Sequence, residues 1–265
     1  MEACSGAHHW AREFAKFGHT VRLMAPKFVA PYRMSGKRGK NDAADAAAIC
    51  EAVTRPNMRF VPIKTIEQQS RLFVHRARPG YVEQRTALIN RIRGLLSELG
   101  IVLPLKAAVI RGEAHKHLED LPGWCNTVIG DALSELTHLD ERIHEYDKHI
   151  AHIAKEDEQS RQLMQLGGIG PTTASAIVAT VGKGHDFTCG RQFCAWLDPY
   201  LRTLLIMGAK AVLSAAKNKT DPVSRWAISV QERRGYWKAV VAIAAKNARM
   251  CWAMLQRGEA FKMPA

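Results

Sequence analysis

Several common signatures are missing from the chain, and each absence excludes a class of protein. No run approaches the ~18 apolar residues of a membrane-spanning helix. The six cysteines include no CxxC pair, so neither a disulfide framework nor a zinc site is expected. The P-loop, GxSxG and HExxH motifs are absent as well. Residues 1–14 lack the basic start and apolar core of a signal peptide, which predicts a cytoplasmic protein.

Acidic residues are in the minority. Lys and Arg number 38 against 25 Asp and Glu, which gives a net charge of +13. Such a charge favours polyanions, of which nucleic acid is the commonest inside a cell; the alternative is a soluble protein that is simply basic. Twelve basic residues face four acids over 55–116, three face eleven over 119–158, and twelve face three over 202–262. Two nucleic-acid-facing parts separated by an acidic spacer are therefore expected.

Few strands are predicted. Residues 20–24 and 59–63 are short, β-prone and flanked by turn signals, and a helix capped by Asn41 begins between them. This order is typical of a piece of an α/β sheet, but two strands alone cannot form a stable one. We expect a mainly α chain with a partial α/β N-terminal region at 1–65, a helical spacer at 66–160 and a helical C-terminal domain at 161–265.

The acidic spacer carries a heptad pattern. Apolar residues alternate steps of four and three over three heptads: Ala132, Leu136, Leu139, Ile143, Tyr146, Ile150 and Ile153. This pattern predicts a coiled coil, although an amphipathic helix packed on its own domain would show it too. A second helical stretch spans 66–99, and Pro79-Gly80 should kink or split it.

Carboxylates at the start of the first long helix are candidate metal ligands. Asp42 and Asp45 are three residues apart and project from the same side, and Glu2 is a further candidate. Such carboxylates hold Mg²⁺ for phosphodiester chemistry. The alternative is that they complement the helix dipole. A basic run precedes them, and its Lys37, Arg38 and Lys40 are candidate nucleic-acid contacts.

Residues 166–182 read LGGIGPTTASAIVATVG and are similar to a helix-hairpin-helix motif. Glycines allow the tight turn, and amides at the start of the next helix can face a phosphate. Gly168, Gly170 and Thr172 are therefore candidate contacts to a nucleic-acid backbone. A plain turn between two helices would also use glycines.

Six strings spread over the whole chain point to one family: MEACSGAHHWAREF, KNDAADAAAICEAV, RPNMRFVPIKT, LGGIGPTTASAIVA, YLRTLLIMGAKAVL and KNARMCWAMLQRGE. Together they resemble the DEDD transposases of bacterial insertion sequences, which pair a RuvC-like domain with a C-terminal serine domain. The RNase H-like fold of that domain would then account for the α/β region.

The resemblance implies roles and partners. Glu2 matches the second metal-binding acid of the family, and Asp42 and Asp45 match the third and fourth, with Mg²⁺ as the cofactor. The partners would be the DNA of the element ends and target, a structured guide RNA and further copies of the chain, joined through 132–153. No membrane would be involved, and the location would be the bacterial cytoplasm at the nucleoid. In the family, a serine of the second domain attacks the DNA and forms a covalent link.

The chain departs from the family twice. It begins at a Met-Glu-Ala that is normally internal, so the strand with the first acid would be missing. Leu197 runs directly into Asp198, where the family has the segment with the nucleophilic serine, and no intact catalytic serine is expected. We therefore expect an insertion-sequence transposase with impaired DNA cleavage and rejoining. The alternative is a non-catalytic nucleic-acid-binding remnant that could interfere with intact transposase.

Overall fold

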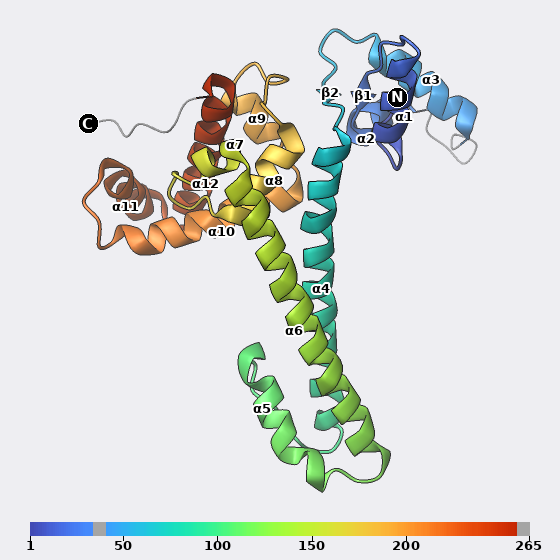
Figure 1. Cartoon of the computed structure of the whole chain (residues 1–265). Coiled ribbons are helices and arrows are strands. Elements are labelled where there is room, and N and C mark those ends of the chain that lie inside the picture. Colours follow the sequence, from blue (N-terminus) through green and yellow to red (C-terminus); the bar gives the residue numbers. More distant parts are fainter. Residues whose placement is uncertain (34–40, 259–265) are drawn as a thin grey trace.

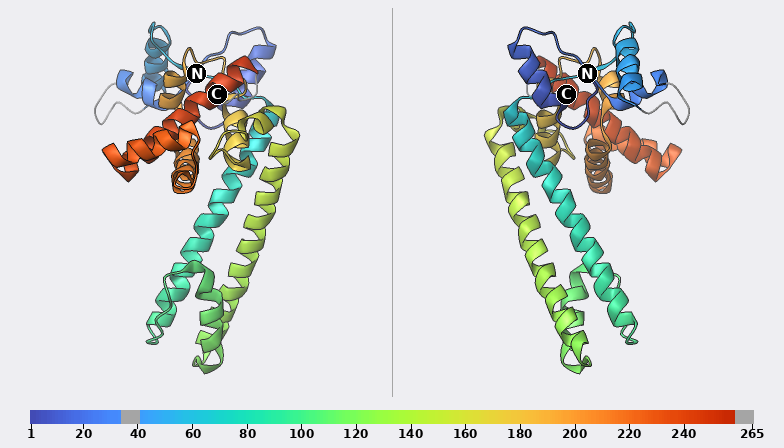
Figure 2. Two further views of the ribbon diagram at one scale, coloured as in Figure 1. Left: turned by 90° about the vertical axis from the view of Figure 1, so that its left-hand side faces the viewer. Right: turned by 90° about the vertical axis from the view of Figure 1, so that its right-hand side faces the viewer.

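The computed structural model describes residues 1–33 and 41–258 and consists mainly of helices (Figure 1). A long helical hairpin extends from one end of the molecule, and the N-terminal part and the C-terminal domain both lie at the other end (Figure 2). None of the described helices is long and apolar enough to cross a bilayer. The expectation of a mainly α chain is confirmed.

The N-terminal part surrounds a very small sheet. Its elements are α1 (Ala7–Lys16), β1 (Leu23–Met24), α2 (Pro26–Val29), the 3₁₀ helix η1 (Ala30–Tyr32), α3 (Asp42–Val53) and β2 (Phe60–Val61). The strands β1 and β2 pair antiparallel, with Leu23 opposite Val61. They are the only strands among the described residues, so the sheet is as incomplete as the sequence indicates. Two strands of two residues do not establish a RuvC-like fold.

The hairpin is formed by α4 (Ile66–Ser97) and α6 (Trp124–Glu156), with α5 (Ala107–His117) and the 3₁₀ helix η2 (Leu118–Asp120) near its far end (Figure 1). Thr65 and Gln68 form a capping box at the start of α4. Pro79 lies inside α4, which continues through it. Of the two expected outcomes, a kink or a split, the split is therefore wrong, because packing against α6 supports the helix on both sides of the missing N–H.

The heptad residues of α6 face the same chain. Leu136 and Leu139 are buried in one cluster with Leu88, Ile92 and Leu96 of α4. Further along α6, two more heptad residues are buried, Ile143 and Ile150. The heptad residues thus pack within the hairpin of a single chain, and pairing between chains through 132–153 is not confirmed.

Arginines of α4 pair with two aspartates of α6 and with the aspartate that directly follows it. The pairs are Arg71 with Asp157, Arg78 with Asp147 and Arg85 with Asp140, at 3.0, 2.5 and 3.1 Å. The three arginines are spaced seven residues apart, so they recur on one face of α4. Because each pair is partly buried, the pairs favour one register of the two helices.

The C-terminal domain consists of six helices, of which α8 is the most deeply buried. Its elements are α7 (Glu158–Leu163), α8 (Pro171–Val181), α9 (Gly190–Trp196), α10 (Pro199–Ala216), α11 (Pro222–Arg234) and α12 (Tyr236–Arg257). Every residue of α8 from Thr173 to Val181 is buried. The largest apolar cluster of the described residues lies here and extends over α8, α9, α10 and α12. This domain therefore has a core of its own.

Candidate functional site

Two of the three candidate carboxylates contact the same arginine. The guanidinium of Arg33 donates from Nη2 to Glu2 at 3.0 and 3.2 Å, and its Nε lies 2.9 Å from an oxygen of Asp45. Glu2 reaches this place because it bridges to Met24 of β1, and Asp45 because it lies in the first turn of α3. The structure thus brings Glu2 and Asp45 together around one positive charge.

Asp42 does not join this group. It is exposed at the first residue of α3, and Asn41 caps the helix by accepting a hydrogen bond from the Ala44 N–H at 2.8 Å. Within residues 1–33 and 41–258, no three His, Cys, Asp or Glu side chains are placed to hold a metal ion. The predicted contacts Lys37, Arg38 and Lys40 lie outside the described residues. In this arrangement the guanidinium of Arg33 is the shared counterion of Glu2 and Asp45.

The glycine turn before α8 packs against α10. Gly168 has a φ of +84°, which favours glycine, and a β-carbon there would lie 2.7 Å from the carbonyl oxygen of Gly208. Asn247 of α12 donates to the carbonyl of Gly167 at 2.9 Å and is itself buried. Gly168 is therefore needed for packing within the domain, which the sequence motif did not reveal.

Gly170 and Thr172 lie differently from Gly168. Gly170 is exposed and is the N-cap residue of α8, with open space around its α-carbon. Thr172 is half-buried in the first turn of the same helix, and no acidic residue lies in that turn. The start of α8 therefore retains the features of a phosphate-facing helix end, with Pro171 replacing one amide donor.

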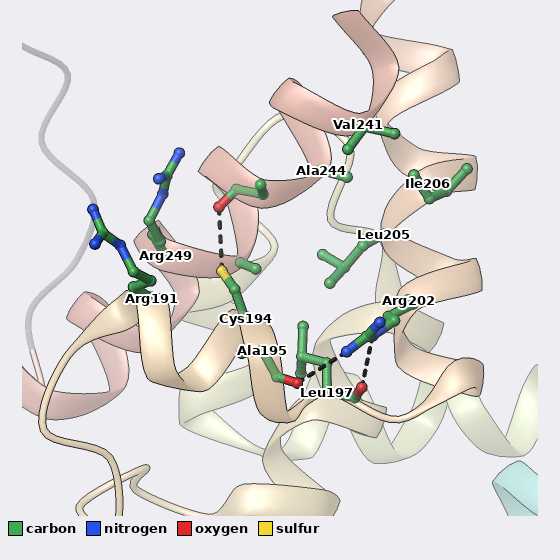
Figure 3. Close-up of a pocket in the computed structure, with 12 residues that line it drawn as sticks. Arg191, Cys194, Ala195, Leu197, Arg202, Leu205, Ile206, Val241, Ala244 and Arg249 are labelled. Atoms are coloured by element: carbon green, nitrogen blue, oxygen red, sulfur yellow. Dashed lines mark hydrogen bonds between the residues drawn. The ribbon is translucent and has the colours of Figure 1, made fainter. Parts of the chain in front are cut away.

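The Leu197–Asp198 junction lies beside a pocket between α9, α10 and α12 (Figure 3). Asp198 caps α10 by accepting from the Leu201 N–H at 2.8 Å, so only this one residue separates Leu197 from the start of α10. The pocket has a volume of about 500 Å³. Its floor is apolar and includes Leu205, Ile206 and Ala248.

Three arginines line this pocket, and sequence reasoning did not single them out. Arg202 is fixed by donating to the carbonyls of Leu197 and Ala195 at 2.7 and 2.9 Å. Arg191 and Arg249 lie side by side at the edge of the pocket and point outward (Figure 3). No acidic residue is among those that line it, so its edge is strongly positive. Their only signal in the sequence was the basic character of the C-terminal region.

The serines near the domain core do not reach this pocket. Ser175 is buried and donates to the carbonyl of Pro171 at 2.7 Å. Ser224 is buried too and donates to Asp221 at 2.6 Å. Neither serine lines the pocket, and neither do Ser214 or Ser229. The described residues therefore place no serine beside the three arginines.

Comparison with known proteins identifies the family. A family model described as "Transposase" matches residues 1–101, and one described as "Transposase IS116/IS110/IS902 family" matches residues 160–197. A Pseudomonas aeruginosa protein named "Probable family 20 transposase" is 41% identical over 289 positions, which cover 99% of this chain and 85% of that protein. The transposase for insertion sequence element IS1111A of Coxiella burnetii is 38% identical over 298 positions, covering 100% of this chain and 79% of that protein.

The transposase for insertion sequence element IS1328 of Yersinia enterocolitica is 31% identical over 284 positions, covering 98% of this chain and 84% of that protein. All three alignments are longer than the 265 residues of the chain, so each relative has residues without a counterpart here. The alignments cover the N-terminal part, the hairpin and the C-terminal domain. The chain belongs to the IS116/IS110/IS902 family of insertion-sequence transposases.

Proposed function

We propose that this transposase-family chain binds the DNA of an insertion sequence through the basic surface of its C-terminal domain, and that its strand cleavage is impaired. The observation that carries the proposal is the Leu197–Asp198 junction. There the chain passes straight into α10 beside a pocket lined by three arginines and no serine. Arginine side chains can bind phosphate, but they do not supply the nucleophile that forms a covalent link to DNA.

Two surfaces support contact with DNA. Arg191 and Arg249 are exposed at the edge of the pocket and have no acidic partner among the described residues. The start of α8, at Gly170 and Thr172, offers backbone donors on the same domain. Such contacts bind the phosphate backbone without reading the base sequence.

Mg²⁺ at Glu2, Asp42 and Asp45 remains a proposal that depends on Arg33. A divalent ion between Glu2 and Asp45 requires that the guanidinium leave both carboxylates. When bound, the ion would polarise a phosphodiester. The chain's own contribution would be the two carboxylates that now hold Arg33.

A guide RNA and a second copy of the chain are the remaining proposed partners. The heptad seam is buried within the hairpin, so 132–153 could join two chains only if the hairpin opened. The far end of the hairpin instead exposes apolar side chains around Trp124, which is 85% exposed. We expect Trp124→Ser to shift a dimer toward monomer in light scattering. A monomeric parent chain would contradict association at this end.

Two measurements on the purified chain test the proposal. Retention of a DNA duplex that carries the element ends should weaken steeply between about 50 and 200 mM salt. The double variant Arg191→Gln, Arg249→Gln should lower the slope of log affinity against log salt by up to about two, since each phosphate contact contributes about one. The matched control Arg225→Gln, an exposed arginine of α11, should leave it unchanged.

The second measurement addresses cleavage. A supercoiled plasmid with joined element ends is incubated with the chain, its RNA and Mg²⁺, and DNA attached covalently to protein is assayed. No adduct together with salt-sensitive retention supports binding without cleavage. An adduct would mean that a serine away from the junction acts as the nucleophile, and the claim of impairment would be wrong.

A further inference from the structure

A buried lysine lies between the N-terminal part and the hairpin. Lys64 is 8% exposed and directly precedes the capping box of α4. Its backbone is held by α1 from two sides: its N–H donates to His8 Nδ1 at 3.3 Å, and its carbonyl accepts from Arg12 at 2.6 Å. Its Nζ lies 3.3 Å from His8 Nε2. The backbone of Lys64 is therefore held by α1, and its ammonium group lies beside the imidazole Nε2, which is also a donor.

The groups around Lys64 are basic. Arg12 lies on α1, and Arg76 lies on α4 and acts on both Lys64 and His8. Burial first and then Arg76 lower the pKa of Lys64. Burial lowers the pKa of His8 to about 4, and Lys64, Arg12 and Arg76 add to this. These four residues, His8, Arg12, Lys64 and Arg76, are called the Lys64 cluster below.

The cluster has no carboxylate partner among the described residues. None of its members forms a salt bridge there, whereas seven other arginines of the chain do. The acid that acts on Lys64 is Asp198, whose carboxylate already caps α10. A buried charge is costly unless it is paired and hydrogen-bonded. The cluster therefore has the charge and the donors of an anion site, and one of its members, Arg76, is exposed.

We propose that the Lys64 cluster binds a phosphate group of a nucleic-acid strand. The proposal rests on the proposed function, in that the strand would be one the transposase already holds. A phosphate presents several acceptor oxygens, which suit the ammonium of Lys64, the imidazole of His8 beside it and the positive charge of Arg12 and Arg76. Asp198, which acts electrostatically on Lys64, is the N-cap residue of α10 at the Leu197–Asp198 junction.

The salt dependence of nucleic-acid binding tests the proposal. Lys64→Met removes the ammonium and keeps the apolar part of the side chain. Arg76→Gln changes an exposed residue, so this second variant is expected to fold even if the first does not. Each should lower the slope of log affinity for a DNA duplex against log salt by about one. The matched control is Arg91→Gln, an exposed arginine further along α4, which should leave the slope unchanged. A parallel titration with a structured RNA shows which strand supplies the phosphate.

A thermal-unfolding experiment separates this site from the proposed function. Inorganic phosphate, compared with chloride at equal ionic strength, should raise the Tm of the parent chain but not that of Lys64→Met or Arg76→Gln. If phosphate does so and the chain binds no nucleic acid, the anion site holds and the proposed function is wrong. If the chain binds nucleic acid and neither variant changes the slope, the Lys64 cluster is not a phosphate contact.

Discussion

The backbones of Gly168 and Gly208 are in direct contact, and a β-carbon on Gly168 would lie 2.7 Å from the carbonyl oxygen of Gly208. The turn before α8 and the middle of α10 are thereby held against each other without any side chain between them. A β-carbon on Gly208 would in turn overlap the carbonyl oxygen of Gly168. Since both obstacles are backbone atoms, neither can turn aside.

Gly208→Ala should therefore destabilise the protein. Overpacking of this kind typically costs about 1–3 kcal/mol, and we expect the upper end because backbone must move. Urea unfolding followed by circular dichroism measures the change. The control is Gly94→Ala in α4, where nothing lies within 4 Å and alanine should stabilise the helix by about 0.5–1 kcal/mol. Equal effects of the two substitutions would show that the glycine contact is unimportant.

Stability should fall as the pH drops from about 6.5 to 4, and His75 should account for much of the loss. His75 is buried between Ser175 at 3.0 Å and Tyr200 at 3.1 Å. Because Ser175 donates to Pro171, His75 must donate from Nε2 to Ser175 and accept from Tyr200 at Nδ1. The neutral ring is thus the form that the fold accommodates.

Burial, with a further effect of Arg78, lowers the pKa of His75 from 6.5 to about 4. The unfolded chain therefore binds more protons than the folded chain over that range, and stability is full above pH 6.5 and lost below it. The shift of the His75 pKa corresponds to a loss of roughly 3 kcal/mol in the free energy of unfolding at low pH. In urea titrations at several pH values, His75→Gln should flatten this dependence. Part of the pH dependence should remain in this variant, because the pKa of His8 is lowered to about 4 as well.

Arg33→Gln should increase the affinity of the chain for Mn²⁺. The substitution removes the cation that Glu2 and Asp45 now share, so a divalent ion no longer has to displace it. A charge-assisted contact is worth about 1.5 kcal/mol, which predicts an increase of about tenfold or more in a calorimetric titration. The control is Arg55→Gln, which removes a pair with Glu51 on the same helix α3. Unchanged affinity in Arg33→Gln would rule out a cation site between Glu2 and Asp45.

Ile143→Asp should weaken folding of the hairpin itself. Ile143 is a heptad residue of α6 and only 7% exposed. The variant therefore buries a carboxylate that has no partner. A loss of about 4 kcal/mol is expected in urea unfolding. His144→Asp, an exposed neighbour, should change stability by less than about 0.5 kcal/mol. If the Ile143→Asp chain remains stable and only its oligomeric state changes, the heptad residues of 132–153 join two chains.

Features set by neighbouring residues could be predicted from the sequence. Asn41 caps α3 as expected, because a cap needs only a side chain and the amide three residues on. Whether Pro79 splits α4 could not be decided from the sequence, because a helix continues through a proline only where neighbouring elements support it. The contact of Arg33 with Glu2 joins residues 31 positions apart. The contact of Gly168 with Gly208 likewise depends on the tertiary fold. Neither contact could therefore be predicted from the local sequence.

The pairs Arg78–Asp147 and Arg85–Asp140 are seven residues apart on both arms, which makes the length of the hairpin adjustable by one heptad. A heptad of α4 is about 10 Å long, and α6 returns antiparallel over the same distance. Removing residues 79–85 and 140–146 would delete the Arg85–Asp140 pair and leave the other two pairs aligned. The reach of the far end could therefore differ between members of the family in steps of about 10 Å, while the N-terminal part and the C-terminal domain stay adjacent.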